Sequence, residues 1–443
     1  MSDLLSIGLS GVTAYQSALS AVGENVANAQ TPGYARRDIV LSERIGAGNR
    51  DFGGVEASSV NRAWDAYRAA DSRYAASAAS RADVRQQWLG SVETTLDDGP
   101  AGVGQLMGGF FDAAQSLAAS PSDAQGRSAM LTALDSTASA IRTTANGLSR
   151  ISDGIAQAVQ TDVDGLNADL KALAQVNQSL QQTPVGLASR ASIEDQRDQI
   201  IDSIAQRIDV SASIGANGTA TLTLGSATGI TLLDPNAQVT ISAASAADGR
   251  IQLRMFANGT TSPLPATGGR LAGLVDVAAS TADKRTALNA MAQKFTTDVN
   301  NWSAQGIDGN GNPGGPLLSM TAGAASLQVA TLDPSAIAAA STDGTENGNL
   351  LQLSSLRGST GAEAGWAALV STNAQALSSA KSEASATAAR RDSSFAARDE
   401  VSGVNLDSEA ADLLRYQRAY DSSAKVIQVA RDTVQSILDL FGN

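Results

Sequence analysis

The side chains that could do chemistry in this chain are few, because its 443 residues include neither cysteine nor histidine. Without cysteine there is no disulfide and no zinc–thiolate site, and without histidine the commonest general base is missing. Two adjacent carboxylates, Asp97 and Asp98, could act as an acid and a base. They stand directly before Gly99 and Pro100, and this pattern is typical of a helix end followed by a turn. We expect no catalytic site.

Two glycine-rich stretches raise the question of a metal or phosphate site. The run from Asp308 to Asn312 begins like a calcium-binding loop, which requires glycine at its sixth position and glutamate at its twelfth. Pro313 and Ser319 occupy those positions, so a structural turn is expected. The stretch 102–109 lacks the lysine and the serine or threonine of a phosphate-binding loop. The sequence predicts no metal and no cofactor.

Apolar residues recur every seven positions near both ends of the sequence. Such a repeat indicates a helix that buries one narrow stripe against another helix. We expect the two ends to pair with each other or with the ends of neighbouring copies, as in an assembly subunit. The alternative is an amphipathic helix at each end, packed on its own domain. The two sets are Leu5, Val12, Leu19 and Val26, and Leu406, Leu413, Tyr420, Ile427, Val434 and Phe441.

Charge and composition argue against two kinds of partner. The formal net charge is −13, and an acidic protein is not expected to bind nucleic acid or an anionic membrane through bulk charge. Aromatic residues make up only 4% of the chain, which leaves few rings to stack on bases. No apolar run reaches the length of a membrane span. We therefore expect no nucleic acid partner and no membrane insertion.

The elements that must position these residues are mostly helical. Apolar residues at steps of three and four from Leu131 to Leu180 predict one long helix with Leu148 and Leu166 buried. At 1.5 Å per residue this helix would be about 75 Å long, so a rod is expected rather than a globule. Other helices are expected at residues 4–29, 62–97, 104–119, 190–207, 270–303, 361–399 and from 406 onward.

The pattern changes between residues 208 and 269. The stretch from Thr219 to Leu224 alternates with a period of two, and turn residues separate it from a second alternating stretch at Val239–Ile241. These stretches predict small antiparallel strands. Residues 304–360 are rich in glycine, serine and asparagine, which predicts a second, loop-rich insertion.

Together these patterns predict a mainly α fold with an inserted β domain. The N- and C-terminal parts of the chain would form an elongated antiparallel helical bundle, folded back so that both ends lie together. The expected division is terminal coiled-coil helices at 1–36 with 404–443, a helical rod at 37–207 with 270–303 and 361–403, the β domain at 208–269 and the loop-rich insertion at 304–360.

Four stretches resemble the flagellar rod, hook and hook-associated proteins. The N-terminal signature, NVANAQTPGY, runs from Asn25 to Tyr34, and the C-terminal signature includes SGVNLD at 402–407 and LRYQRAY at 414–420. The stretches 268–274 and 306–315 are similar to the same family. The C-terminal signature is most similar to that of the hook-associated members, which favours this branch of the family.

The resemblance implies a structural subunit of the bacterial flagellum that joins hook to filament. It also implies export through the flagellar type III apparatus without a cleaved signal. The protein would be cytoplasmic before export and would be secreted to the hook–filament junction. The implied partners are the hook protein, the second hook–filament junction protein, further copies of the chain around the flagellar axis, and an export chaperone that holds the C-terminal helix.

Three residues join the two heptad sets as the expected assembly interface. Tyr34 and Arg36 directly follow the N-terminal helix and can lock the angle at which the chain leaves it. Tyr416 flanks the C-terminal stripe, where neighbouring residues set register and partner in helical assemblies. Arg36 and Arg37 form a basic pair, for which an interface ion pair and a solvated pair are equally consistent.

Three other functions fit parts of the sequence. A hook or distal rod subunit would share the N-terminal signature, but it would usually lack the Leu-Leu-Arg-Tyr-Gln form of the C-terminal one. A surface adhesin could use the β insertion. An enzyme on the flagellar axis would need two acids that line a cleft in residues 208–269 or 304–360, where the acids are scattered. The two signatures favour a structural junction protein over all three.

Overall fold

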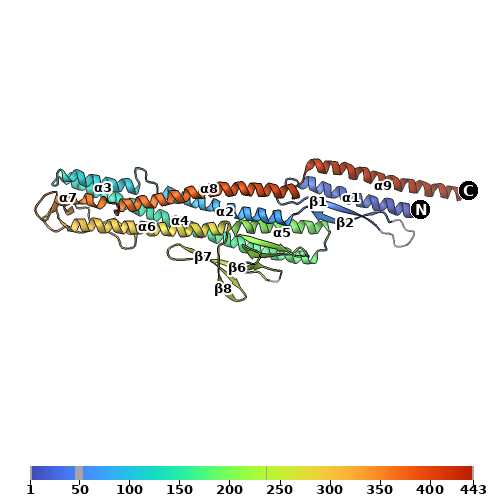
Figure 1. Ribbon diagram of the computed structural model, residues 1–443, viewed down its shortest axis with the longest axis horizontal. Coiled ribbons are helices and arrows are strands. Elements are labelled where there is room, and N and C mark those ends of the chain that lie inside the picture. The colour runs from blue at the N-terminus through green and yellow to red at the C-terminus, as the bar shows by residue number, and fades with distance from the viewer. Residues whose placement is uncertain (1, 45–52, 236, 442–443) are drawn as a thin grey trace.

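The chain forms a long helical rod with a separate helix pair at one end (Figure 1). A computed structural model describes residues 2–44, 53–235 and 237–441. The predicted fold class, an elongated helical bundle with small antiparallel sheets inserted, is confirmed. The helices are α1 (Ser2–Asn28), α2 (Ala66–Thr95), α3 (Val103–Ala118), α4 (Ala124–Gln182), α5 (Ala188–Arg207), α6 (Gly269–Ala304), α7 (Gly348–Gln352), α8 (Ala362–Ser402) and α9 (Leu406–Phe441).

Helix α4 is the backbone of the rod. It has 59 residues, which corresponds to about 90 Å at 1.5 Å per residue. The Asp123 carboxylate caps its start by accepting hydrogen bonds from the backbone N–H groups of Gln125 and Gly126. Leu148 and Leu166 are fully buried. The prediction of one long helix with these two leucines in the core is confirmed.

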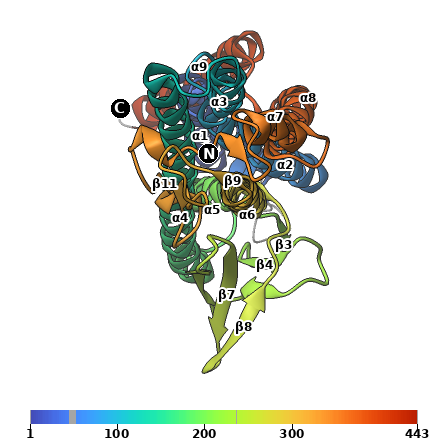
Figure 2. The ribbon, with the colours of Figure 1, turned by 90° about the vertical axis from the view of Figure 1, so that its left-hand side faces the viewer.

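Helices α2, α4, α6 and α8 lie side by side along the rod (Figures 1 and 2). Their buried residues form two clusters. One cluster is built around aromatic rings: Phe110 meets Phe295 edge-on with centroids 5.9 Å apart, and Trp302 and Trp366 belong to the same cluster. The other joins the middle of α4 to α5 and to the inserted strands. Burial of apolar surface between several elements stabilises this thin body.

Strands β3 to β8 project from one side of the rod (Figure 2). They form two antiparallel sheets, in the orders β3-β4-β5 and β6-β7-β8. Two asparagines of α4 dock them: Asn177 exchanges two hydrogen bonds with the backbone of Ala220, and Asn167 does so with Ile241, all at 2.8 Å. The strands predicted at 219–224 and 239–241 are confirmed as β4 and β6. The bounds are β3 (Val210–Ile214), β4 (Ala220–Leu224), β5 (Thr231–Leu233), β6 (Thr240–Ser245), β7 (Ile251–Ala257) and β8 (Thr260–Leu264).

Residues 304–360 cover the end of the rod farthest from the helix pair (Figure 1). Asp308 Oδ1 accepts hydrogen bonds from the backbone N–H groups of Asn310 and Asn312, both at 2.8 Å, so this stretch is the turn that the sequence predicts. Within the described ranges, no group of acidic side chains is arranged to hold a metal ion. The short strands are β9 (Gly306–Ile307), β10 (Leu318–Ser319), β11 (Gln328–Val329) and β12 (Ala340–Ser341).

Two paired strands between α1 and α2 pack against α1. Strand β1 (Arg37–Glu43) pairs antiparallel with β2 (Val55–Arg62). The backbone N–H of Val55 donates to Ser10 Oγ of α1 at 3.2 Å. A short, partly polar strand pair has little apolar surface of its own. Its stability depends on the helix that covers it.

Candidate assembly site

The two ends of the chain meet in an antiparallel helix pair, α1 with α9 (Figure 1). Gly8 lies against Ile427, and Gly11 lies against Ser423. A β-carbon added to Gly8 would be 2.6 Å from Ile427 Cγ1, and one added to Gly11 would be 2.5 Å from Ser423 Oγ. The missing side chains therefore allow the two helices to approach closely. The seam of the pair is built on small residues at these points.

On α1 the seam does not follow the predicted heptad stripe. Leu5 and Val26 are 36% and 44% exposed, and Val12 and Leu19 are half-buried. Within the chain these residues are not the buried stripe, because close helix packing places small residues at the contact and leaves larger ones at its margin or outside it. Their burial against neighbouring copies stays a prediction. The buried side chains of α1 are instead Ala14, Ala18, Ala21, Val22 and Asn25.

On α9 the predicted stripe is partly buried. Tyr420, Ile427 and Val434 are half-buried, whereas Leu406 and Leu413 are 51% and 38% exposed. The first two turns of α9 therefore do not bury their stripe leucines within the chain. These leucines remain available to other molecules.

Tyr416 contacts α1 directly, with its ring centroid 6.4 Å from that of Tyr15. It therefore belongs to the seam rather than to its flank. The side chain of Phe441 lies outside the described part of the structure. After pairing, large apolar residues stay exposed along both helices, namely Leu4, Leu5, Leu9, Val26, Leu406, Leu413, Leu414, Val426, Val429, Ile437 and Leu438.

Asn25, which we did not predict as an interface residue, closes the helix pair near the rod. Its side chain is 1% exposed. Its Nδ2 donates to Glu409 Oε2 at 3.1 Å and to the Arg37 carbonyl at 2.9 Å. Its Oδ1 accepts from the Arg37 N–H at 2.9 Å and from the Tyr34 hydroxyl at 2.8 Å. A sequence signal does exist, because Asn25 stands two heptads after Gly11 and so shares its face of the helix.

Tyr34 and Arg36 form the corner between α1 and β1. Burial raises the pKa of Tyr34 to about 12, so its hydroxyl remains a hydrogen-bond donor to Asn25 at neutral pH. Arg36 acts through its backbone: its N–H donates to the Ser402 carbonyl at 2.9 Å, and its carbonyl accepts from the Ala63 N–H at 2.8 Å. The corner thus ties the segment that leaves α1 to the segment that enters α9.

The two members of the basic pair have different surroundings. Arg36 forms an ion pair with the half-exposed Asp38 at 3.2 Å. Arg37 is 8% exposed and forms ion pairs with Glu24 at 2.6 Å and with Asp195 of α5 at 3.2 Å. Arg37 therefore connects the helix pair to the rod. These ion pairs lie within the chain, and Arg37 is buried rather than solvated.

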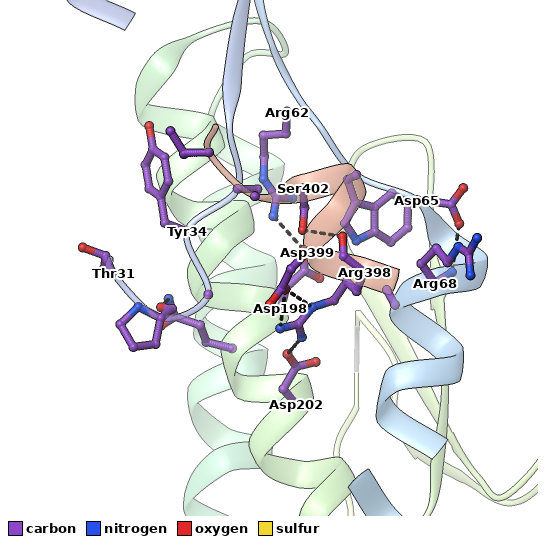
Figure 3. A pocket seen from close by; sticks show the side chains of 18 of the residues that line it. Thr31, Tyr34, Arg62, Asp65, Arg68, Asp198, Asp202, Arg398, Asp399 and Ser402 are labelled. Atoms are coloured by element: carbon purple, nitrogen blue, oxygen red, sulfur yellow. Dashed lines mark hydrogen bonds and ion pairs between the residues drawn. The ribbon is translucent and has the colours of Figure 1, made fainter. Parts of the chain in front are cut away.

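Asp195 begins a row of three acids on one face of α5, followed by Asp198 and Asp202. Arg62 of β2 reaches Asp195 and Asp198 at 2.8 and 2.9 Å. Arg73 of α2 reaches Asp198 and Asp202 at 3.3 and 2.7 Å. Figure 3 shows the last two acids together with arginines from β2 and from α8. The row therefore joins β1, β2, α2 and α8 to α5 at the base of the helix pair.

Burial and the arginines act in opposite directions on these acids. Burial raises the pKa of Asp195 and outweighs the lowering effect of Arg62 and Arg37. Burial also acts to raise the pKa of Asp198, but the guanidinium groups of Arg197, Arg62 and Arg73 together hold it below its usual value. An acid that is tied to several arginines is suited to fasten elements together rather than to transfer protons.

An open cavity of about 740 Å³ lies at the same joint (Figure 3). Pro32 and Tyr34 of the corner line one side, and Arg398 and Ser402 of the segment before α9 line another. Arg398 forms an ion pair with Asp202 at 3.2 Å, so charged groups hold the walls together. The cavity lies where the chain passes twice between the rod and the helix pair, which marks this region as their joint.

Comparisons with known families identify both the rod and the end of the chain. The family model described as "Flagellar hook-associated protein FlgK helical domain" matches residues 89–318. The model described as "Flagellar basal body rod FlgEFG protein C-terminal" matches residues 397–440. The first match covers more than half of the chain, and the second covers most of α9. No helix in the described ranges has the length and hydropathy needed to cross a bilayer.

Individual relatives agree with these matches. The chain is 26% identical to flagellar hook-associated protein 1 of Escherichia coli (strain K12) over 326 residues, 71% of this chain and 59% of that protein. It is 23% identical to flagellar hook-associated protein 1 of Bacillus subtilis (strain 168) over 499 residues, 97% of this chain and 96% of that protein. The chain thus spans about three fifths of the length of the Escherichia coli relative.

A solved structure shares the fold. The flagellar hook junction protein FlgK from Burkholderia pseudomallei superimposes with a TM-score of 0.67 at 16% sequence identity. The superposition covers 75% of this chain and 100% of that chain. At this identity the likeness concerns the fold alone.

Proposed function

The chain belongs to the family of the flagellar hook-associated protein FlgK, and on this premise we propose that it is a structural subunit that joins the hook of the bacterial flagellum to its filament. It assembles through its terminal helices and has no catalytic role. The match to the FlgK helical domain over residues 89–318 favours this role over that of a hook or distal rod subunit. Two relatives to which the chain is similar are named flagellar hook-associated protein 1.

The observation that carries the proposal is the apolar surface left on α1 and α9 after they pair. Leu9, Leu414 and Val429 are 61%, 54% and 63% exposed. Exposed apolar residues along a helix pair indicate a protein–protein contact surface. Neighbouring copies arranged around the flagellar axis would cover this surface through repeated head-to-tail contacts. The exposed heptad residues Leu5, Val26, Leu406 and Leu413 belong to the same surface.

The other proposed partners are those that the resemblance to flagellar axial proteins implies. The hook protein and the second hook–filament junction protein contact the ring of subunits from its two sides. An export chaperone holds the C-terminal helix before assembly, since that helix exposes apolar residues over its length. The protein is cytoplasmic until the flagellar type III apparatus exports it, and it is then secreted to the junction.

Electron microscopy of a strain that lacks the protein tests this function. We expect hooks without attached filaments, and we expect the wild-type gene to restore filaments. A strain that still bears filaments on its hooks, or that lacks hooks as well, would contradict the junction role.

A matched pair of variants tests the terminal helices in the same strain. Ile427→Asp places an unpaired charge in the seam against Gly8, which is costly, so filaments should not attach. Gln428→Asp places the same charge at the next, exposed position and should restore filaments. Circular dichroism of both purified variants should show an intact rod. Equal filament attachment in the two strains would count against assembly through this seam.

A further inference from the structure

The start of α9 is anchored by a single buried side chain. Among the side chains of α9 that the structure describes, two are buried: Glu409 and Ala430, each 2% exposed. The residues of α9 that precede Glu409, from Leu406 to Ser408, are all exposed. The first turn therefore contributes little packing of its own. The point at which α9 begins to pair with α1 therefore depends on the contacts of Glu409.

Apolar packing alone leaves the register of α9 ambiguous. Gly11 lies against Ser423, and the residue seven positions further along α9 is Ala430. Alanine is as small as serine, so a slip of seven residues would place an equally small side chain against Gly11. Such a slip moves α9 by about 10 Å along α1. The connection at 403–405 can accommodate this displacement of α9 if the exposed first turn of α9 unwinds.

The hydrogen bonds of Asn25 are not repeated seven residues later. The same slip would replace Glu409 by Tyr416 opposite Asn25. The amide cannot simply turn to another partner, because its Oδ1 already accepts from the Arg37 N–H and the Tyr34 hydroxyl. Those two bonds keep Nδ2 directed at α9. A buried amide proton without an acceptor is costly, and a single buried asparagine is a known means of fixing the register of paired helices.

We propose that Asn25 is a positioning residue that sets the register of α9 on α1 through its hydrogen bond to Glu409. The register decides which apolar residues the helix pair presents to neighbouring copies, and in this consequence the inference rests on the proposed function. The register itself is a property of the isolated chain. It can therefore be tested without any flagellum.

The chain suits a distance measurement because it has no cysteine. Gln16→Cys and Gln428→Cys place single thiols at exposed positions on α1 and α9. Nitroxide labels on the purified full chain, measured by double electron–electron resonance, report the separation of the two helices along their axis. The label pair is combined with Asn25→Leu, with Glu409→Gln, which keeps an acceptor for Nδ2, and with Asn28→Leu. Asn28 is the matched control, since its Nδ2 donates to the Glu24 carbonyl within α1.

We expect one narrow distance distribution for the label pair alone, for Asn28→Leu and for Glu409→Gln. Asn25→Leu should add a second, separate distance population, as expected when α9 is displaced along α1 by about 10 Å, the length of seven helical residues. One unchanged distance in Asn25→Leu would overturn the proposal, since glycine packing or the 403–405 connection would then set the register. A broad distribution in Asn25→Leu, or in the otherwise unaltered chain, would overturn it as well, since no defined register would exist. If the unaltered protein did not localise to the flagellum, this would contradict the proposed function but not the inference about the register.

Discussion

Gly8 of α1 and Ile427 of α9 are in contact across the terminal helix pair, with Ile427 Cγ1 2.6 Å from the position that a β-carbon on Gly8 would occupy. The chain therefore joins its first and last helices at a point where one of them has no side chain. Gly23, also in α1, has more space. No atom lies within 4 Å of a β-carbon placed on Gly23, so the two positions form a matched pair.

Gly8→Ala should weaken the α1–α9 pair. Alanine favours the helical conformation over glycine by about 1 kcal/mol, but overpacking of a close contact costs about 1–3 kcal/mol. Gly23→Ala gains the first effect without the second and should leave the pair intact or stabilise it. Amide hydrogen exchange of the α9 residues around Ile427 measures the difference. Equal exchange rates in the two variants would show that the close approach at Gly8 does not matter.

The helix pair should become more stable as the pH falls through the titration of Glu409. Burial raises the pKa of this carboxyl, and its hydrogen bond from Asn25 and the charge of Arg36 offset part of that effect. A folded-state pKa above the unfolded value means that the stabilising contribution is present below the unfolded pKa, about 4.3 for glutamate. It is lost as the pH rises through the raised folded-state pKa.

Glu409→Gln removes this titration and keeps a hydrogen-bond acceptor. Compared with the unaltered chain, the variant should therefore be more stable at neutral pH, and its stability should vary less between pH 4 and neutral pH. Thermal unfolding followed by circular dichroism at several pH values provides the comparison. Parallel pH profiles for the two proteins would exclude Glu409 as the source of the dependence.

Asp198→Asn should destabilise the joint between the helix pair and the rod. The substitution leaves Arg62, Arg73 and Arg197 without the charge that each of them contacts, and removal of one partner from a buried ion pair costs about 3–5 kcal/mol. Asp399→Asn, at a carboxyl that is 61% exposed, should cost at most about 1 kcal/mol. Urea unfolding of the two variants measures both values. Similar losses would mean that the buried acid has no special role.

The pKa of Asp198 also predicts how the stability of this joint changes in acid. Although burial acts to raise its pKa, the three arginines hold the pKa below its usual value. The contribution of Asp198 to stability is therefore present above the unfolded pKa of about 3.9 and is lost as the pH falls through the lower folded-state value. This direction is opposite to that of Glu409. The helix pair and the joint should thus respond differently to acid.

The sequence by itself determined the long elements and the family. Steps of three and four residues persist from Leu131 to Leu180, and a signal repeated over so many turns outweighs local irregularities. The alternation at Thr219–Leu224 identified a strand for the same reason. The signatures at 25–34 and 402–420 indicated a flagellar axial protein, and the comparisons confirm this family.

Only the tertiary structure decided which face of each terminal helix is buried. A heptad count finds large apolar residues such as Leu5, but the contact is made where Gly8 and Gly11 have no side chains, and that depends on the partner helix. The spacing of Asp195 and Asp198 is visible along α5 as well, yet three of the arginines that bind them, Arg37, Arg62 and Arg73, come from distant parts of the chain. Local sequence patterns show the period of a helix, whereas the tertiary fold determines which residues, separated by hundreds of positions, come into contact.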